Sequence, residues 1–87
     1  MALYAVEFRR SALKDLRRLD AATQRRVLRA AENLASDPRP AGCRKMQGSA
    51  NAFRIRIGDY RVVYTVADDV LIVAIERVRH RREVYRR

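Results

Sequence analysis

Residues 53–64 read Phe-Arg-Ile-Arg-Ile-Gly-Asp-Tyr-Arg-Val-Val-Tyr, and this stretch decides most of the expected fold. Apolar residues alternate with basic or small ones on both sides of Gly58-Asp59. Such alternation is typical of a half-buried strand, and a Gly-Asp pair between two such runs is typical of a tight turn. The stretch therefore predicts a β-hairpin.

The expected hairpin has two different faces. With a two-residue turn, Ile57 pairs with Tyr60, and the following pairs bring the other large apolar side chains onto the same face. On the other face Arg56 lies opposite Arg61, with Arg54 two positions along. Like charges placed directly opposite each other destabilise a sheet, so a bound anion is one explanation for this pattern. A solvated surface and neutralisation by acidic neighbours are the alternatives.

Length and composition indicate one small globular domain. The chain has 87 residues, of which 48% are hydrophobic, and we expect residues 1–87 to fold as a single unit. No apolar run approaches the ~20 residues needed to cross a bilayer. The N-terminal residues lack the basic start and apolar stretch of a signal peptide. We therefore expect a cytoplasmic protein with no membrane association.

The sequence predicts no metal and no cofactor. Cys43 is the only cysteine and His80 the only histidine, so neither a disulfide within the chain nor a cysteine-based zinc site can form. Cys43 lies in a connection rich in Pro and Gly, far along the chain from His80, which argues against a role as nucleophile.

The charge balance favours an anionic partner. The net charge is +10, and because Lys14 and Lys45 are the only lysines, 18 of the 20 basic residues are arginines. The planar guanidinium group grips phosphate with two parallel hydrogen bonds. A charge this high favours nucleic acid, an acidic protein, or both.

The first half of the chain predicts a strand and two helices. Alternation around Val6 indicates a strand near residues 4–8, and Ser11 can cap a helix that follows. Asp20 or Thr23 can cap a second helix, which the Pro residues of segment 37–40 bring to an end. The expected inner faces of the two helices consist of Ala12, Leu13, Leu16, Leu19, Val27, Leu28, Ala31 and Leu34.

The second half predicts further strands. A short strand is expected around residues 44–47, before the hairpin, and the apolar run at 70–75 indicates a central strand with cover on both faces. The order β-α-α-β-β-β-β gives an α+β domain: a mostly antiparallel sheet of four to five strands, with two helices on one face and a short C-terminal turn or helix.

Arginines are then expected to gather on the open face of the sheet. A second two-residue turn, at Asp68-Asp69, would set Arg61 opposite Glu76, so an ordinary surface salt bridge is one interpretation. One carboxylate cannot satisfy all the nearby guanidinium groups, and a surplus of them suits phosphate. The arginines in question are Arg54, Arg56, Arg61, Arg79, Arg81 and Arg82.

Two further side chains could serve a nucleic-acid site. Tyr85 follows the arginines and could stack on an unpaired base, or could pack a C-terminal turn against the sheet. Histidine is the residue type whose ordinary pKa lies near neutrality, so His80 is the natural candidate to move a proton, although a lone histidine is often incidental. Arginines stabilise developing negative charge but do not release protons.

Taken together, these stretches resemble the RelE/ParE superfamily of bacterial toxins, and more closely its RelE branch. The resemblance runs nearly from end to end. It is carried by residues 4–8, 12–16 with Leu19, 37–40, 54–64 and 78–85. The hairpin and the C-terminal segment together are the most specific part.

The resemblance implies the toxin of a type II toxin–antitoxin pair. RelE-like toxins are endoribonucleases that cleave mRNA, typically on the ribosome, without a metal. By likeness, Arg54, Arg56 and Arg61 would bind the phosphate and the transition state, Arg81 would lie near the leaving group, and Tyr85 would orient a base. Arg79, Arg82 and Lys45 would add RNA contacts. The implied partners are mRNA, the ribosome and a small antitoxin protein encoded by an adjacent gene.

One departure keeps an alternative open. The best-known RelE pattern has lysines where Arg54 and Arg56 stand here, and arginine cannot be tuned to exchange a proton. Proton transfer would then fall to His80 or to ribosomal RNA. ParE-like relatives share the fold, lack this nuclease set and inhibit DNA gyrase, which is the alternative function.

Overall fold

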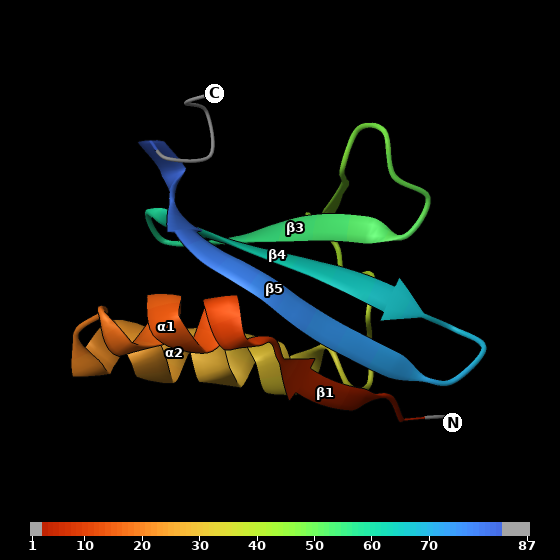
Figure 1. The fold of residues 1–87 in the computed structure, drawn as a ribbon, viewed down its shortest axis with the longest axis horizontal. Helices are drawn as coiled ribbons and strands as arrows, with labels where there is room; N and C mark the ends of the chain where they lie inside the picture. The colour runs from red at the N-terminus through yellow and green to blue at the C-terminus, as the bar shows by residue number, and fades with distance from the viewer. Residues whose placement is uncertain (1–2, 83–87) are drawn as a thin grey trace.

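In the computed structural model, which describes residues 3–82, two helices pack on one face of a five-stranded sheet (Figure 1). The elements in chain order are β1 (Ala5–Phe8), α1 (Arg10–Arg17), α2 (Ala21–Asn33), β2 (Arg44–Lys45), β3 (Ala52–Ile57), β4 (Tyr60–Ala67) and β5 (Ile72–His80). The sheet order is β1-β5-β4-β3-β2, with β1 parallel to β5 and the other neighbours antiparallel. The expected α+β class and element order are confirmed.

The helices differ from the expectation in detail. Helix α1 begins at Arg10, one residue before the expected cap Ser11, whereas α2 begins directly after Asp20 as expected. Leu13 and Leu28 were assigned to the inner faces, but 39% and 41% of their surfaces are exposed. Asp15 instead takes a buried position on α1, because it is bonded to the sheet.

The β3–β4 hairpin forms as expected. Ile57 pairs with Tyr60 across a two-residue turn, and Arg56 pairs with Arg61. Gly58 has φ +60°, and a Cβ built there would lie 3.1 Å from the Arg26 guanidinium group of α2. A side chain at this position would therefore meet both an unfavourable backbone conformation and a neighbouring helix.

The apolar face of the hairpin forms the core against the helices. Tyr64 is fully buried, stacks on Phe53 with ring centroids 5.9 Å apart, and donates a hydrogen bond from its hydroxyl to the Pro38 carbonyl at 2.8 Å. Burial raises the pKa of Tyr64 well above its ordinary value of 10.0. This hydrogen bond fastens the segment after α2 to the centre of the sheet.

Strand β5 departs from the expected register. It begins at Ile72, because Val70 and Leu71 lie in the turn and are 58% and 38% exposed. The pairing with β4 then shifts between Val63 and Tyr64, where β5 contributes one extra residue in a β-bulge. The expected strand at residues 70–75 was therefore placed two residues too early.

Asp15 bonds the second half of β5 where β1 no longer covers it. Strand β1 ends at Phe8, and beyond it the Asp15 carboxylate accepts a hydrogen bond from the Val78 amide at 2.9 Å. The Arg77 guanidinium group donates to the same carboxylate at 2.9 and 3.2 Å. Burial raises the pKa of Asp15, but these hydrogen bonds outweigh it and hold the pKa below its ordinary value. Helix α1 thus replaces a neighbouring strand at this edge.

A second carboxylate joins three segments at the other end of the sheet. Asp68 accepts hydrogen bonds from Arg39 at 2.7 and 3.3 Å and from the Tyr4 hydroxyl at 2.6 Å. These partners, Arg39 first, lower the pKa of Asp68.

Neither helix of the described chain has the length and apolar character that would let it span a membrane.

Candidate functional site

Five arginines share the face of the sheet that the helices leave open, and we call them the arginine cluster. Arg44 pairs with Arg54 across β2 and β3, while Arg56, Arg61 and Arg79 pair in one row across β3, β4 and β5. Paired residues project to the same side of a sheet, so strand spacing sets these side chains ~5 Å apart at their origins. The cluster consists of Arg44, Arg54, Arg56, Arg61 and Arg79.

The expected pairing of Arg61 with Glu76 is wrong. The connection after β4 takes four residues rather than two, and the bulge then adds one more, so that Arg61 lies opposite Arg79. Glu76 instead contacts the Arg9 guanidinium group at 3.5 Å and the Thr65 hydroxyl at 3.4 Å. The register therefore replaces a carboxylate beside Arg61 with another guanidinium group.

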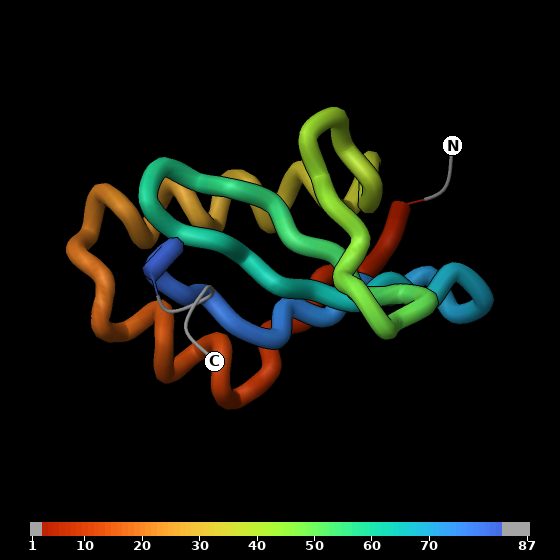
Figure 2. Tube along the Cα trace, turned by 90° about the horizontal axis from the view of Figure 1, so that it is seen from above, coloured from red at the N-terminus to blue at the C-terminus, as the bar shows by residue number. Residues whose placement is uncertain are grey.

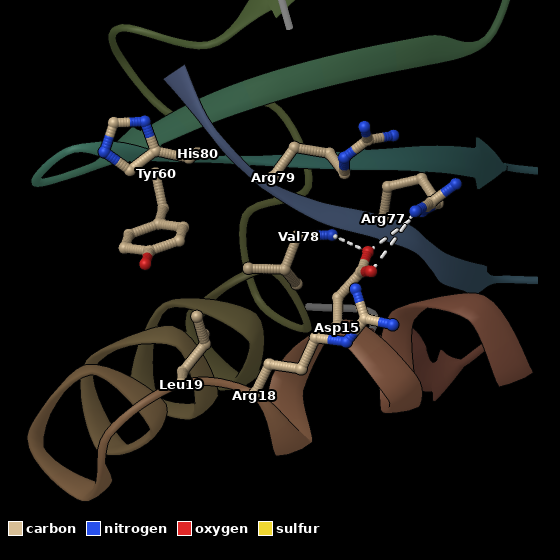
Figure 3. Close-up of a pocket in the computed structure, with 8 residues that line it drawn as sticks. All are labelled: Asp15, Arg18, Leu19, Tyr60, Arg77, Val78, Arg79 and His80. Carbon is tan, nitrogen blue, oxygen red and sulfur yellow. Dashed lines mark hydrogen bonds and ion pairs between the residues drawn. The ribbon is translucent and has the colours of Figure 1, made fainter. Parts of the chain in front are cut away.

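The bulge explains why Val78 lies on the core face of β5 and Arg79 on the open face. Val73 and Ile75 are buried two residues apart, but the next buried apolar residue on that face, Val78, comes three residues later. The extra residue lets all three reach the core and turns Arg79 outward. Figure 3 shows Arg79 extending from β5 away from the helices, while Asp15 reaches up from α1.

The cluster lines a depression on the surface. Its volume is about 450 Å³, and it is formed by Gly42, Ile55 and four members of the cluster, namely Arg44, Arg54, Arg56 and Arg61. Within residues 3–82, no carboxylate lies within 4.0 Å of the guanidinium groups of Arg44 and Arg54. Arg56 is oriented by a hydrogen bond from its Nε to the Gly58 carbonyl at 3.0 Å. The depression is thus a cationic site of the kind that suits phosphate.

The remaining candidate residues occupy different places. The Arg81 amide donates to the Asp59 carbonyl at 2.7 Å, so Arg81 lies beside the hairpin turn, and Arg82 follows it directly. Figure 2 shows the end of β5 next to the turn between β3 and β4. Lys45 lies at the opposite edge, next to Arg44 on β2. Tyr85 and the rest of the expected C-terminal turn or helix lie outside the described residues.

His80 does not share the face of the arginine cluster. It pairs with Tyr60, and their rings meet edge to face with centroids 5.3 Å apart. Its Nδ1 accepts a hydrogen bond from the Arg82 amide at 3.2 Å. Alternation along β5 therefore turns His80 to the side opposite Arg79, away from the phosphate that the cluster would hold.

Arg44 is the site residue that sequence reasoning missed. A two-residue strand leaves almost no periodic signal, so its pairing partner could not be read from the sequence. The spacing of three between Ile75 and Val78 is the signal that could have revealed the bulge and, through it, the place of Arg79.

The residues present suit anion binding rather than metal binding. Within residues 3–82, no three His, Cys, Asp or Glu side chains lie where they could hold a metal ion together. Guanidinium groups at this density can bind a phosphate through several charge-assisted hydrogen bonds.

Comparison with known proteins decides the family. Residues 6–85 match the family model described as the ParE toxin of the type II toxin–antitoxin system parDE. The chain belongs to this toxin family. It is 34% identical to toxin RelG of Mycobacterium tuberculosis, with 97% of this chain and 98% of the relative aligned. It is also 30% identical to putative toxin RelE1 of Methanocaldococcus jannaschii over 95% and 96% of the two chains.

Solved structures of RelE toxins share the fold of this toxin. It superposes on a chain of the archaeal RelE–RelB complex from Pyrococcus horikoshii with a TM-score of 0.82 and 30% identity, covering 91% and 96% of the chains. Against the isolated Escherichia coli RelE toxin the TM-score is 0.78 at 25% identity, with 88% and 83% covered. The resemblance to the RelE/ParE superfamily is therefore confirmed, and the chain is a type II toxin of that superfamily.

Proposed function

We propose that this toxin is a metal-independent endoribonuclease that cleaves mRNA on the ribosome and so stops translation. The observation that carries the proposal is the arginine cluster. Two rows of guanidinium groups on one open face, around a depression of about 450 Å³, suit a single phosphate of an RNA backbone and the negative charge that develops on it.

The reaction uses the RNA's own chemistry. The ribose 2′-oxygen attacks the adjacent phosphorus, loses its proton, and the bond from phosphorus to the 5′-oxygen breaks as that oxygen gains a proton. Arg61 lies in the middle of the row Arg56–Arg61–Arg79, so it is best placed to neutralise the equatorial oxygens. Arg81, beside the hairpin turn, is assigned to the side of the leaving group.

The arginine cluster offers no side chain that is suited to transfer protons. Guanidinium groups in general neither give up nor accept a proton in proteins, and His80 faces the other side of the sheet. The proton transfers therefore fall to ribosomal RNA or water. Cleavage should then be much slower on free RNA than on a translated message.

An antitoxin is the proposed protein partner. A similar toxin from Pyrococcus horikoshii was solved as a RelE–RelB complex, and one from Mycobacterium tuberculosis was solved in the toxin–antitoxin complex RelBE2. With a net charge of +10 and five arginines on one open face, this toxin suits an acidic antitoxin that covers that face. Co-expression of the product of an adjacent gene should restore growth to cells that express the toxin.

Induced expression followed by primer extension tests the nuclease. We expect translation to halt and new 5′ ends to appear inside translated codons, with the effect lost in Arg61→Ala and Arg81→Ala variants. Full toxicity with intact messages would contradict the proposal.

Inhibition of DNA gyrase is the second candidate, because the matching family model is that of ParE. It predicts accumulation of gyrase–DNA complexes and a DNA-damage response. It also predicts that Arg81→Ala remains toxic, which separates it from the nuclease.

A further inference from the structure

The turn between β3 and β4 is contacted from three directions. The Gly58 carbonyl accepts a hydrogen bond from Arg56 Nε at 3.0 Å, and the Asp59 carbonyl accepts one from the Arg81 amide at 2.7 Å. The third contact comes from the helix layer, because the Arg26 guanidinium group of α2 lies directly against Gly58. Figure 2 shows this turn in front of α2. Strand β3, the residue after β5 and helix α2 therefore all meet at a turn of two residues.

Arg26 occupies the space that a side chain at Gly58 would need. The three atoms nearest to the position of a Cβ on Gly58 all belong to the Arg26 guanidinium group, at 3.1, 3.4 and 3.6 Å. Within residues 3–82, no carboxylate lies within 4.0 Å of this guanidinium group, so an ion pair does not account for its position. Its planar group instead covers the backbone of the turn.

The direction of Arg56 depends on the same turn. Arg56 is exposed and lies opposite Arg61, so repulsion between like charges pushes its side chain away from the cluster and into solvent. The hydrogen bond to the Gly58 carbonyl opposes this movement. A change in the orientation of that carbonyl would therefore redirect Arg56, and the next carbonyl along the chain would move Arg81 with it.

We infer that Arg26 is a positioning residue for the arginine cluster. By covering Gly58 it keeps the turn in the conformation that directs Arg56 toward the bound phosphate and places Arg81 beside the hairpin. Arg26 acts through the turn and does not touch RNA itself. The inference rests on the proposed nuclease function for its effect on cleavage, whereas its effect on Arg56 is measurable without RNA.

NMR of the free protein tests the contact between Arg26 and the turn. In ¹⁵N-labelled toxin, Arg26→Ala should speed the exchange of the Arg56 Nε–Hε proton with water about fivefold, roughly what the loss of one hydrogen bond produces. The spectrum of Arg56→Lys lacks this signal and so assigns it. The amide of Val73, which is buried in the core, should keep its chemical shift and so report an intact fold. Unchanged exchange at Arg56 in Arg26→Ala would overturn the inference.

Cleavage of a translated message tests the consequence for the reaction. Arg26→Ala should lower kcat about tenfold with little change in KM, because a shift of ~1 Å in a positioned group can cost up to 10²-fold in rate. Arg26→Lys keeps a long cationic side chain over the turn and should recover most of the rate. A higher KM with unchanged kcat would show that Arg26 binds RNA directly, which contradicts a positioning role.

Arg29→Ala is the matched control. Arg29 lies one turn further along α2 and is also exposed, so the variant removes the same charge from the same helix and leaves Arg26 in place. We expect the exchange at Arg56 and the value of kcat to match the wild type. Equal effects of the Arg26 and Arg29 variants would show a general loss of positive charge and would overturn the inference.

The outcomes separate the two proposals. If the wild-type toxin leaves messages intact, the nuclease proposal fails, and the exchange at Arg56 still decides whether Arg26 holds the turn. If Arg26→Ala cleaves messages at the wild-type rate with unchanged exchange at Arg56, the nuclease stands and the positioning role fails.

Discussion

The arginines of this toxin form two groups that have different roles. Arg39 and Arg77 each bind one carboxylate, Asp68 and Asp15, and so fasten segments that lie far apart in the sequence. The arginine cluster instead sets guanidinium groups opposite one another across four strands. The contrast teaches that the number of arginines says little about function; the residue opposite each one decides it.

The largest expected effect is on the cluster. Arg61→Ala should lower the rate of mRNA cleavage by about 10²–10³-fold, because it removes the central group that stabilises the developing charge. Cleavage is measured by primer extension and folding by circular dichroism. Arg39→Ala is the matched control, since it removes an arginine that binds a carboxylate away from the cluster. Equal activity in the two variants would abolish the distinction between the groups.

The next effect is on stability. Asp15→Ala should lower the free energy of unfolding by about 2 kcal/mol, because it leaves the Val78 amide and Arg77 without their acceptor. We expect less than for a fully buried pair because the Arg77 side chain is 42% exposed. Urea denaturation measures the loss, and Asp69→Ala, at an exposed turn position, is the control. A loss no larger than in the control would show that α1 does not hold β5 through this carboxylate.

The pH dependence follows from the same carboxylate. Its pKa is lower in the folded than in the unfolded chain, so its contribution is present above the ordinary carboxyl value of 3.8 and is lost as pH falls through the folded value. The difference in unfolding free energy between wild type and Asp15→Asn should be constant from about pH 7 to 5 and shrink by about pH 3. Denaturation at these three pH values measures it. A difference that stays constant down to the lowest pH would argue against charge as the cause.

A smaller effect is expected in the core. Tyr64→Phe removes the hydroxyl that bonds to the Pro38 carbonyl and should cost about 1 kcal/mol of stability. The ring and its stacking on Phe53 remain, so urea denaturation should show a shifted midpoint with an unchanged slope. Tyr60→Phe serves as the control for loss of a less buried hydroxyl. If both variants behave alike, the fastening of the segment after α2 does not depend on this bond.

The smallest effect concerns the exposed ion pair. Arg39→Ala should change stability less than Asp15→Ala does, because Arg39 and Asp68 are 42% and 56% exposed and their attraction is screened. The change should shrink further as salt is added. Thermal unfolding at low and high ionic strength measures this dependence. If the loss of stability does not depend on salt concentration, its cause would instead be the packing of the Arg39 guanidinium group over Phe53, 5.2 Å from the ring centroid.

Sequence reasoning predicted much of the fold and only part of the site. The helix-facing side of the hairpin was predicted because alternation fixes which residues share a face. Leu13 was misplaced because helical spacing alone does not show that Asp15 takes an inner position on α1. On α2 the buried positions are Val27 and Ala31, and Leu28 lies beside them, partly exposed. Arg44 was missed because β2 has only two residues. Arg79 was not paired with Arg61 because the three-residue spacing between Ile75 and Val78 is a weaker signal of a change in register than a turn is.

The sequence by itself determined the hairpin: its two-residue turn, its apolar face, and the opposition of Arg56 and Arg61. All three features involve residues that are close along the chain. The alternation of side chains and the turn at Gly58 are enough to fix their relative positions. Only the tertiary structure decided that Arg79 and Arg44 join them while Glu76 turns to Arg9. Pairing between segments distant in sequence depends on loop length and on one inserted residue, and because side chains alternate with a period of two, that residue reverses which face each side chain occupies.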